Sequence, residues 1–230
     1  MEIVWLAPDY YGFPDPALST DENGIIALGG DFHCDRLLNA YKKGIFPWPH
    51  DNYPLLWFCP DPRFVLEPKN FYRSKSLKKL IRQERYRISF DEDFERVIEN
   101  CSKIKREGQR GTWIIPEMID AYINLHYLGY AHSVEVWEAN TLVGGLYGLC
   151  LGHSFFGESM FAKKRDTSKL AFSFLAEKFI DWGYDFIDCQ AHTTHLESLG
   201  AKNISRAVFL AKLKDTLTKE TLVGSWKSRG

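Results

Sequence analysis

Apolar side chains recur at intervals of three and four residues in six stretches of the chain, and each stretch predicts an amphipathic helix. The ranges are 34–44, 74–84, 91–105, 116–129, 167–183 and 205–217. Residues typical of helix ends support two of them. Asp35 is predicted to cap the helix at 34–44, which Gly44 would end, and Pro116 and Gly129 suit the first turn and the end of the helix at 116–129. The tail after Thr218 is expected to be frayed.

Strand-like runs lie between these helices. They cover 86–90, 132–138, 141–152, 153–161 and 184–190, the last strand we expect. Short turns between the three middle runs predict antiparallel hairpins. Helices, an antiparallel meander, another helix and a final strand are typical of an α+β protein with helices packed on a mixed sheet. The order resembles that of the acetyltransferase-type (GNAT) fold.

The N-terminal quarter has a different character. Turn signals such as FPDP and NGIIALGGDF alternate with aromatic residues, and only one helix is predicted there. The two prolines of CPDPR, residues 59–63, mark a linker. We therefore predict a small N-terminal domain over 1–62 and a GNAT-like, mixed-sheet domain over 63–230.

Composition narrows the classes of protein that fit. The chain has 230 residues, of which 45% are hydrophobic and 26% charged, so it has room for a sizeable core. No stretch reaches the roughly 18 apolar residues of a membrane span, and the N-terminus lacks the features of a signal peptide. Five scattered cysteines suit a reducing compartment, so we expect a cytoplasmic protein without membrane contact.

Charge is uneven along the chain. Residues 69–87 contain eight basic residues and one acid, a balance of +7, so the remainder of this −1 chain carries −8. A second basic cluster is formed by Lys103, Lys105, Arg106 and Arg110. The segment is either a solvated helix face or a footprint for a polyanion such as a nucleic-acid backbone, and the sequence favours neither strongly.

Two tryptophans stand beside turn-forming residues. Trp48 lies between two prolines on a predicted loop, and Trp113 precedes the helix that begins at Pro116. They either pack the loops or provide a surface on which a base of a single-stranded end stacks.

The stretch IDCQAHTTH, residues 187–195, allows two chemistries. Its C-x-x-H-x-x-H spacing suits zinc, but only three candidate ligands cluster here, so we expect no metal. If the strand persists, Asp188 and Gln190 share one face and Cys189 points away. Glu158 stands among apolar residues on a predicted strand, where a carboxylate is either paired or used in chemistry.

Rare strings in a fixed order connect the chain to one family. They include RLLNAYKKGIFPW, CPDPR, GTWI, AHSVEVW, LVGGLYG, GESMF and IDCQ. From about Trp5 to Leu217 the chain resembles the leucyl/phenylalanyl-tRNA–protein transferases. The resemblance implies a cytosolic, two-domain enzyme that moves Leu or Phe, and also Met, from aminoacyl-tRNA to the N-terminal Arg or Lys of acceptor proteins. The product would be a degradation signal of the N-degron pathway, and the reaction would need no cofactor. We expect a monomer.

The same resemblance assigns site residues. Asp188, Gln190 and Glu158 would be catalytic, with the Gln190 amide donating to Asp188 and its oxygen turned toward the incoming amine. Trp48 and Trp113 would stack on the terminal adenosine. The pocket for the transferred side chain would be lined by Leu146, Phe155, Met160, Leu175 and Phe179. The tRNA backbone would meet Lys75, Lys78, Lys79, Arg82 and Arg85.

The sequence departs from the family pattern at a few positions. Met is more usual at Leu146 and an aromatic residue at Leu175, which affects the shape of the pocket, and Asn is expected where Thr193 stands. Two other functions stay open. A CoA-dependent N-acetyltransferase would need a glycine-rich loop, yet FAKKRDTSK, before the helix at 167, has no glycine. A non-catalytic RNA-binding module would show no transfer at all.

Overall fold

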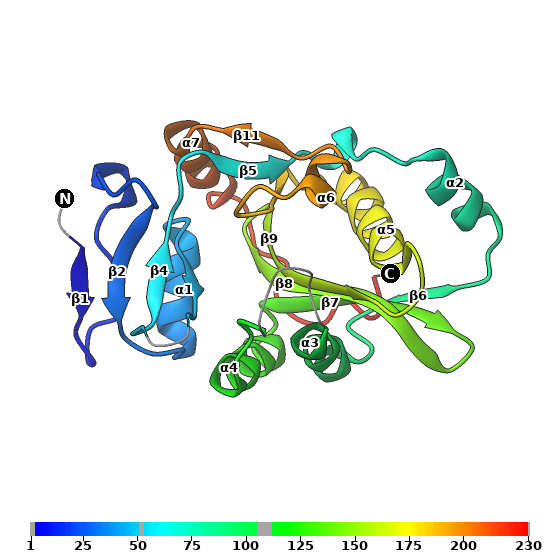
Figure 1. Ribbon diagram of the computed structural model, residues 1–230, viewed down its shortest axis with the longest axis horizontal. Coiled ribbons are helices and arrows are strands. Elements are labelled where there is room, and N and C mark those ends of the chain that lie inside the picture. Colours follow the sequence, from blue (N-terminus) through cyan, green and yellow to red (C-terminus); the bar gives the residue numbers. More distant parts are fainter. Residues whose placement is uncertain (1–2, 51–52, 105–111, 230) are drawn as a thin grey trace.

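The computed structural model describes residues 3–50, 53–104 and 112–229, and its chain forms two sheets (Figure 1). The first sheet has the order β1-β2-β4-β3, with bounds Val4–Leu6, Ile25–Gly29, Leu56–Phe58 and Phe46–Trp48. Strands β1 and β2 are parallel, and the other pairs are antiparallel. Helix α1 (Cys34–Lys42) covers this sheet, and the short 3-10 helix η1 (Pro16–Leu18) precedes β2.

The second sheet has seven strands in the order β11-β5-β10-β9-β8-β7-β6. Their bounds are Lys202–Ile204, Arg63–Leu66, Phe186–Asp188, Ser154–Ala162, Thr141–Leu151, Ala131–Glu138 and Arg87–Phe90. Only β9 and β10 pair in parallel. The predicted class, α+β with a mixed sheet, is confirmed.

Helices cover both faces of this sheet. The remaining elements are η2 (Pro68–Asn70), α2 (Lys75–Arg82), α3 (Phe94–Lys103), α4 (Pro116–Tyr127), α5 (Thr167–Asp181), α6 (Thr194–Glu197) and α7 (Arg206–Thr216). In Figure 1, α5 lies on one face and α3 and α4 on the other. Two adjacent glycines of β8 show why both faces pack closely: a Cβ on Gly144 would meet Thr167 of α5, and one on Gly145 would approach Val97 of α3.

Most predicted elements are present because local sequence determines them. The apolar stripe of α3 is fully buried as expected, and Asp93 accepts the N–H of Arg96 to cap it. Helix α4 begins at Pro116 as predicted, and Gly129, with φ of 82°, follows its end. One cap was predicted wrongly: His33, not Asp35, caps α1 through its Nδ1.

The chain passes from the first sheet to the second between β4 and β5. Buried residues of the first sheet nevertheless form one continuous cluster with those beneath α3 and α4, including Trp57, Tyr41, Tyr122 and Phe156. The division into two domains at residue 62 therefore stays a prediction.

Two expectations for the C-terminal part are wrong. Strand β10 ends at Asp188 and is not the last strand, because β11 follows and pairs with β5. The tail is not frayed: Trp226 is fully buried, stacks on His132 at 3.7 Å, and donates its backbone N–H to Asp91 at 2.7 Å. The packing of this large aromatic ring and the hydrogen bond of the Trp226 backbone together fix the tail on the sheet.

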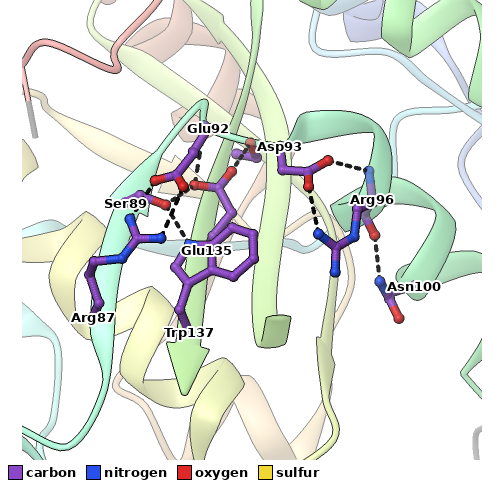
Figure 2. Close-up of polar contacts among 9 residues, drawn as sticks. Arg87, Ser89, Glu92, Asp93, Arg96, Asn100, Glu135 and Trp137 are labelled. Atoms are coloured by element: carbon purple, nitrogen blue, oxygen red, sulfur yellow. Dashed lines mark hydrogen bonds and ion pairs between the residues drawn. The ribbon is translucent and has the colours of Figure 1, made fainter. Parts of the chain in front are cut away.

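Figure 2 shows how β6 and the start of α3 are fastened to β7. Glu135 is fully buried, and it accepts the Ser89 hydroxyl at 2.6 Å and the backbone N–H of Glu92 at 3.4 Å. Burial raises the pKa of Glu135, while these hydrogen bonds oppose the rise. Trp137 donates its indole N–H to the same Ser89 hydroxyl at 2.8 Å. This polar cluster is structural and lies apart from the cavity described next.

Among the described residues, no helix is long and apolar enough to cross a membrane.

Candidate active site

A cavity of about 430 Å³ lies between the two sheets. Strand β3 of the first sheet forms one wall, and the other walls come from Trp113, β8, β9, β10, α5 and the segment 189–196. Because side chains from both sheets line it, the cavity exists only when the two sheets are packed together.

One part of the cavity is apolar. Leu146, Phe155, Met160 and Leu175, four of the five residues expected in the side-chain pocket, line this part. Phe179 is not among its described lining residues: it is fully buried and stacks on Tyr184 behind the wall, with its ring edge-on to Phe155. The structure therefore corrects this assignment, because Phe179 lies one helical turn beyond Leu175 on α5. Two residues that we did not predict, Phe172 and Ile187, complete the apolar wall.

The two predicted tryptophans face the same cavity from different elements. Trp48 ends strand β3 and is not on a loop as expected, and its ring packs edge-on against Phe58 at 5.7 Å. Trp113 comes from the segment before α4. Both are half-buried, so each retains surface that a flat ligand can cover.

Glu158, on β9, is the polar centre of the cavity and is almost completely buried. Its Oε1 accepts the Tyr41 hydroxyl at 2.6 Å and the Gln190 side-chain amide at 2.7 Å. The Tyr41 hydroxyl also shares a short hydrogen bond with that of Tyr122. Oε2 of Glu158 has no hydrogen-bond partner among the described residues. Helices α1 and α4, strand β9 and the segment after β10 thus converge on one carboxylate.

The environment sets the protonation of this carboxylate. Burial raises the pKa of Glu158 to about 7, although the hydrogen bonds from Tyr41 and Gln190 and the nearby Tyr122 hydroxyl limit the rise. The negative charge of Asp188 adds to the increase. A carboxyl group that titrates near neutral pH both accepts and releases a proton readily, which suits general acid–base chemistry.

The relation between Asp188 and Gln190 differs from the prediction. Strand β10 ends at Asp188, and Gln190 has a left-handed backbone with φ of 62°, so strand alternation does not extend to it. Asp188 accepts the backbone N–H of Gln190 at 2.9 Å, whereas the side-chain amide of Gln190 donates to Glu158. Asp188 itself is fully buried and bonded to Arg63. The predicted bond from the Gln190 amide to Asp188 is therefore wrong.

Cys189, the residue after β10, also lies on the other side from that predicted. Ile187 and Cys189 line the cavity, and Asp188 does not. We expected the reverse, with Cys189 pointing away from the site. Burial raises the pKa of the Cys189 thiol, which keeps it uncharged at neutral pH.

The histidines of the same stretch lie toward the rim. His192 contacts Glu197 at 3.2 Å, and His195 lines the cavity. Burial and the charge of Lys169 lower the pKa of His195. Across the described part of the chain, no group of three or more His, Cys, Asp or Glu side chains is placed to hold a metal ion.

The predicted basic segment forms the amphipathic helix α2 and the turn after it. The five cations expected to meet the tRNA backbone, Lys75, Lys78, Lys79, Arg82 and Arg85, are all exposed. A second cavity, of about 450 Å³, is lined by residues of this segment together with Lys164 and Arg165, which precede α5. Glu138 pairs with both Arg85 and Lys164, at 2.7 Å to Arg85.

Of the second basic cluster, Lys103 pairs with Glu99 at 2.9 Å. Lys105, Arg106 and Arg110 lie outside the described residues.

Sequence reasoning missed three residues that shape the site. Tyr41 and Tyr122 fall within the predicted helices 34–44 and 116–129, and Arg63 falls within the linker CPDPR. Their spacing matches that of ordinary core and turn residues, so only their convergence on Glu158 and Asp188 distinguishes them.

Comparisons with known proteins point in one direction. The family described as "Leucyl/phenylalanyl-tRNA protein transferase" matches residues 65–214, and the N-terminal domain of the same family matches residues 30–61. A leucyl/phenylalanyl-tRNA–protein transferase of Anaeromyxobacter sp. (strain Fw109-5) is 51% identical over 223 residues, which cover 97% of this chain and 94% of that protein. One of Myxococcus xanthus (strain DK1622) is 49% identical over 226 residues, covering 98% and 97%.

Solved structures are less similar. A GCN5-related N-acetyltransferase from Kribbella flavida has a TM-score of 0.36 and 7% sequence identity, over 73% of this chain and 60% of that one.

Proposed function

This chain belongs to the leucyl/phenylalanyl-tRNA–protein transferase family, and we propose that the cavity between its two sheets is where the transfer takes place. The chain is an aminoacyltransferase that moves Leu or Phe from aminoacyl-tRNA to the N-terminus of a protein. One observation carries the proposal: an apolar chamber, two half-buried tryptophans and a carboxylate that titrates near neutral pH share one cavity.

The donor would enter with its side chain first. An apolar side chain such as that of Leu or Phe suits the chamber of Leu146, Phe155, Met160 and Leu175, because all four wall residues are apolar. Such a pocket separates Leu, Phe and Met only modestly, because a methylene group changes binding by about 1–3 kcal/mol. The indoles of Trp48 and Trp113 would cover the terminal adenosine by stacking.

The chemistry needs little more than placement and a proton acceptor. The ester of aminoacyl-tRNA is already activated, and the acceptor α-amine has a reference pKa of about 7.7–8.0. The amine nitrogen attacks the ester carbonyl carbon, a C–N bond forms, and the C–O bond to the tRNA breaks. We assign Glu158 to take the proton from the nitrogen through its unpartnered Oε2 and to return it to the leaving oxygen. Bringing two bound reactants together accounts for much of the remaining rate.

Gln190 would act as an orienting group. Its NH2 group donates to Glu158, so its carbonyl oxygen remains available to accept an N–H of the incoming amine. An amide oxygen is too weakly basic to remove the proton itself. Asp188 would act indirectly, because it accepts a hydrogen bond from the Gln190 backbone and does not line the cavity.

The body of the tRNA would lie along the basic segment. Lys75, Lys78, Lys79, Arg82 and Arg85 are exposed cations near the second cavity, where Lys164 and Arg165 add positive charge. Contacts of this kind recognise phosphate and do not read sequence.

The proposal also covers the acceptor proteins, the oligomeric state, the cellular compartment and the role of the product. We propose acceptors that begin with Arg or Lys, a monomeric enzyme and action in the cytoplasm, with the product serving as an N-degron signal. These assignments rest on the resemblance to the family, whose printed name specifies only tRNA and protein.

A donor-competition assay tests the function. The protein is mixed with a peptide that begins with Arg and with either labelled Phe-tRNA or labelled acetyl-CoA. We expect label in the peptide only from Phe-tRNA. Label only from acetyl-CoA would identify an N-acetyltransferase, and RNA binding without label from either donor would identify a binding module.

A further inference from the structure

Arg63 is the first residue of β5, and its whole side chain, including the charged guanidinium group, is buried. Its Nε and Nη2 donate to Oδ1 and Oδ2 of Asp188 at 2.8 and 2.5 Å, and neither side chain has exposed area. The guanidinium carbon lies 4.8 Å from the ring centre of Phe46 and 4.4 Å from that of Phe209. Two parallel hydrogen bonds and two aromatic contacts hold the fork of Arg63 in one orientation.

The constraint passes from Asp188 to Gln190. The same Oδ1 that binds Arg63 accepts the backbone N–H of Gln190 at 2.9 Å. The residue after Arg63 holds the neighbouring peptides: Phe64 donates its N–H to the Gln190 carbonyl at 3.3 Å, and its carbonyl accepts the Cys189 N–H at 2.9 Å. Gln190 is thereby kept in the left-handed region, which non-glycine residues seldom occupy unless their surroundings enforce it.

This backbone geometry determines where the Gln190 side chain points. In an extended continuation of β10 it would share the face of Asp188, away from the cavity. With its observed φ of 62°, its amide meets Glu158 at 2.7 Å. We propose that Arg63 is a positioning residue for the transfer reaction, which holds Asp188 so that the turn at Gln190 presents its amide to Glu158. The inference rests on the proposed function.

Stability alone does not account for this ion pair. A buried pair can usually be replaced by neutral residues of similar volume without loss of stability, whereas removing one partner leaves an uncompensated charge. Arg63 also lies far along the chain from its partner, at a separation of 125 residues, and next to Phe46, a wall residue of the cavity. The pair therefore connects the β5 start, the first sheet and the Gln190 turn.

The test removes the pair without leaving a charge. The double variant Arg63→Met/Asp188→Asn is compared with wild type in single-turnover transfer of Phe from Phe-tRNA to an Arg-peptide. We expect a rate about 10- to 100-fold lower, the size that loss of a supporting contact or a small misplacement produces. The Kd for Phe-tRNA should change less than about twofold, because the apolar chamber and both tryptophans are untouched.

A second readout distinguishes positioning from a general structural role. If the Gln190 turn is released, Glu158 loses the Gln190 hydrogen bond that lowers its pKa. In the double variant the charge of Asp188, which raises that pKa, is lost as well, so the two effects oppose each other. The single variant Arg63→Lys retains the Asp188 charge and can make only a point contact. In it, the acid limb of the pH–rate profile should move to higher pH and the rate should fall.

Arg36→Met is the matched control. Arg36 is also fully buried and hydrogen-bonded, but its partners are Asp31 and the carbonyls of Tyr10, Ala7 and Pro8, which lie away from Asp188 and Gln190 in the chain. We expect it to lower the Tm and to leave the rate per folded enzyme unchanged.

A folded double variant with a wild-type rate would overturn the inference, as would an equal rate loss in Arg36→Met. If the double variant does not fold, a wild-type rate and pH limb in Arg63→Lys would also reject it. Absence of transfer by the wild type would instead reject the proposed function.

Discussion

The side-chain amide of Gln190 donates to Glu158 at 2.7 Å, across a separation of 32 residues, while Asp188, two residues away, holds only the Gln190 backbone. Glu158 thus comes from β9, and Gln190 comes from the turn after β10, the strand that pairs with β9 in parallel. Asp188 does not line the cavity and contacts Gln190 only through the Gln190 backbone N–H. This division of roles leads to five predictions.

The first concerns pH. Burial raises the pKa of Glu158 to about 7, so its proton-accepting form is lost as pH falls through that value. The acceptor amine, with a pKa of about 7.7–8.0, must also be unprotonated. The logarithm of the single-turnover rate should therefore rise with a slope near 2 below pH 7 and near 1 just above it. Glu158→Gln should reduce the rate by about 10²–10⁴-fold and leave a slope near 1 throughout. A slope of 2 in this variant would contradict the role.

The second concerns Tyr41. Its hydroxyl donates to Glu158 at 2.6 Å and lowers the pKa of that carboxyl group. Tyr41→Phe removes the donor, so the Glu158 limb of the pH–rate profile should shift to higher pH. Tyr11→Phe, a change on the half-buried ring that stacks on His33, is the control and should leave the profile in place.

The third concerns Gln190. Gln190→Ala should lower single-turnover transfer by about 10- to 100-fold, since an amine that is no longer oriented reacts more slowly. Binding of Phe-tRNA, measured by filter retention, should persist. Asn124→Ala removes an exposed amide on α4 that lines neither cavity and should have no effect on the rate. An unchanged rate in Gln190→Ala would remove this residue from the mechanism.

The fourth concerns the apolar chamber. Met160→Trp adds volume at a half-buried wall position, so transfer of Phe should fall more than that of Leu. Phe179→Leu alters a residue behind the wall and should lower stability by about 1 kcal/mol without changing the Phe-to-Leu ratio. Competition between the two aminoacyl-tRNAs measures the ratio. Equal changes in both variants would mean that the chamber does not select the side chain.

The fifth concerns the basic segment. If Lys79 and Arg82 each neutralise one phosphate, replacing either with Gln should reduce the slope of log K against log salt by about 0.9. Lys103→Gln is the matched control, because Lys103 lies on α3 and pairs with Glu99. Titration of Phe-tRNA at several salt concentrations gives the slopes. Identical slopes in all three variants would place the tRNA elsewhere.

Much of the fold follows from local patterns. The helices with a buried stripe, such as α3, and the three long strands β7, β8 and β9 agree with the prediction. Their periodicity is repeated over several turns or alternations, so it determines the element whatever surrounds it. Short elements carry too few residues for such a signal, which explains why β11 was missed and β10 was drawn too long.

The candidate site was only partly predictable. Strings such as GESMF and IDCQ led to Glu158 and Gln190, and the tryptophans were singled out by their neighbouring prolines and glycines. Tyr41, Tyr122 and Arg63 could not be found in this way, because each resembles an ordinary core or linker residue.

The sequence by itself therefore determined the family, the order of helices and strands, the apolar character of the pocket and the chemical groups available. The tertiary structure decided how those groups are connected. One left-handed residue, Gln190, turns its amide from the face of Asp188 to that of Glu158, and a buried arginine from another strand supports that turn. The pattern of a strand predicts side-chain direction only while the strand continues, and contacts between distant residues set where it stops.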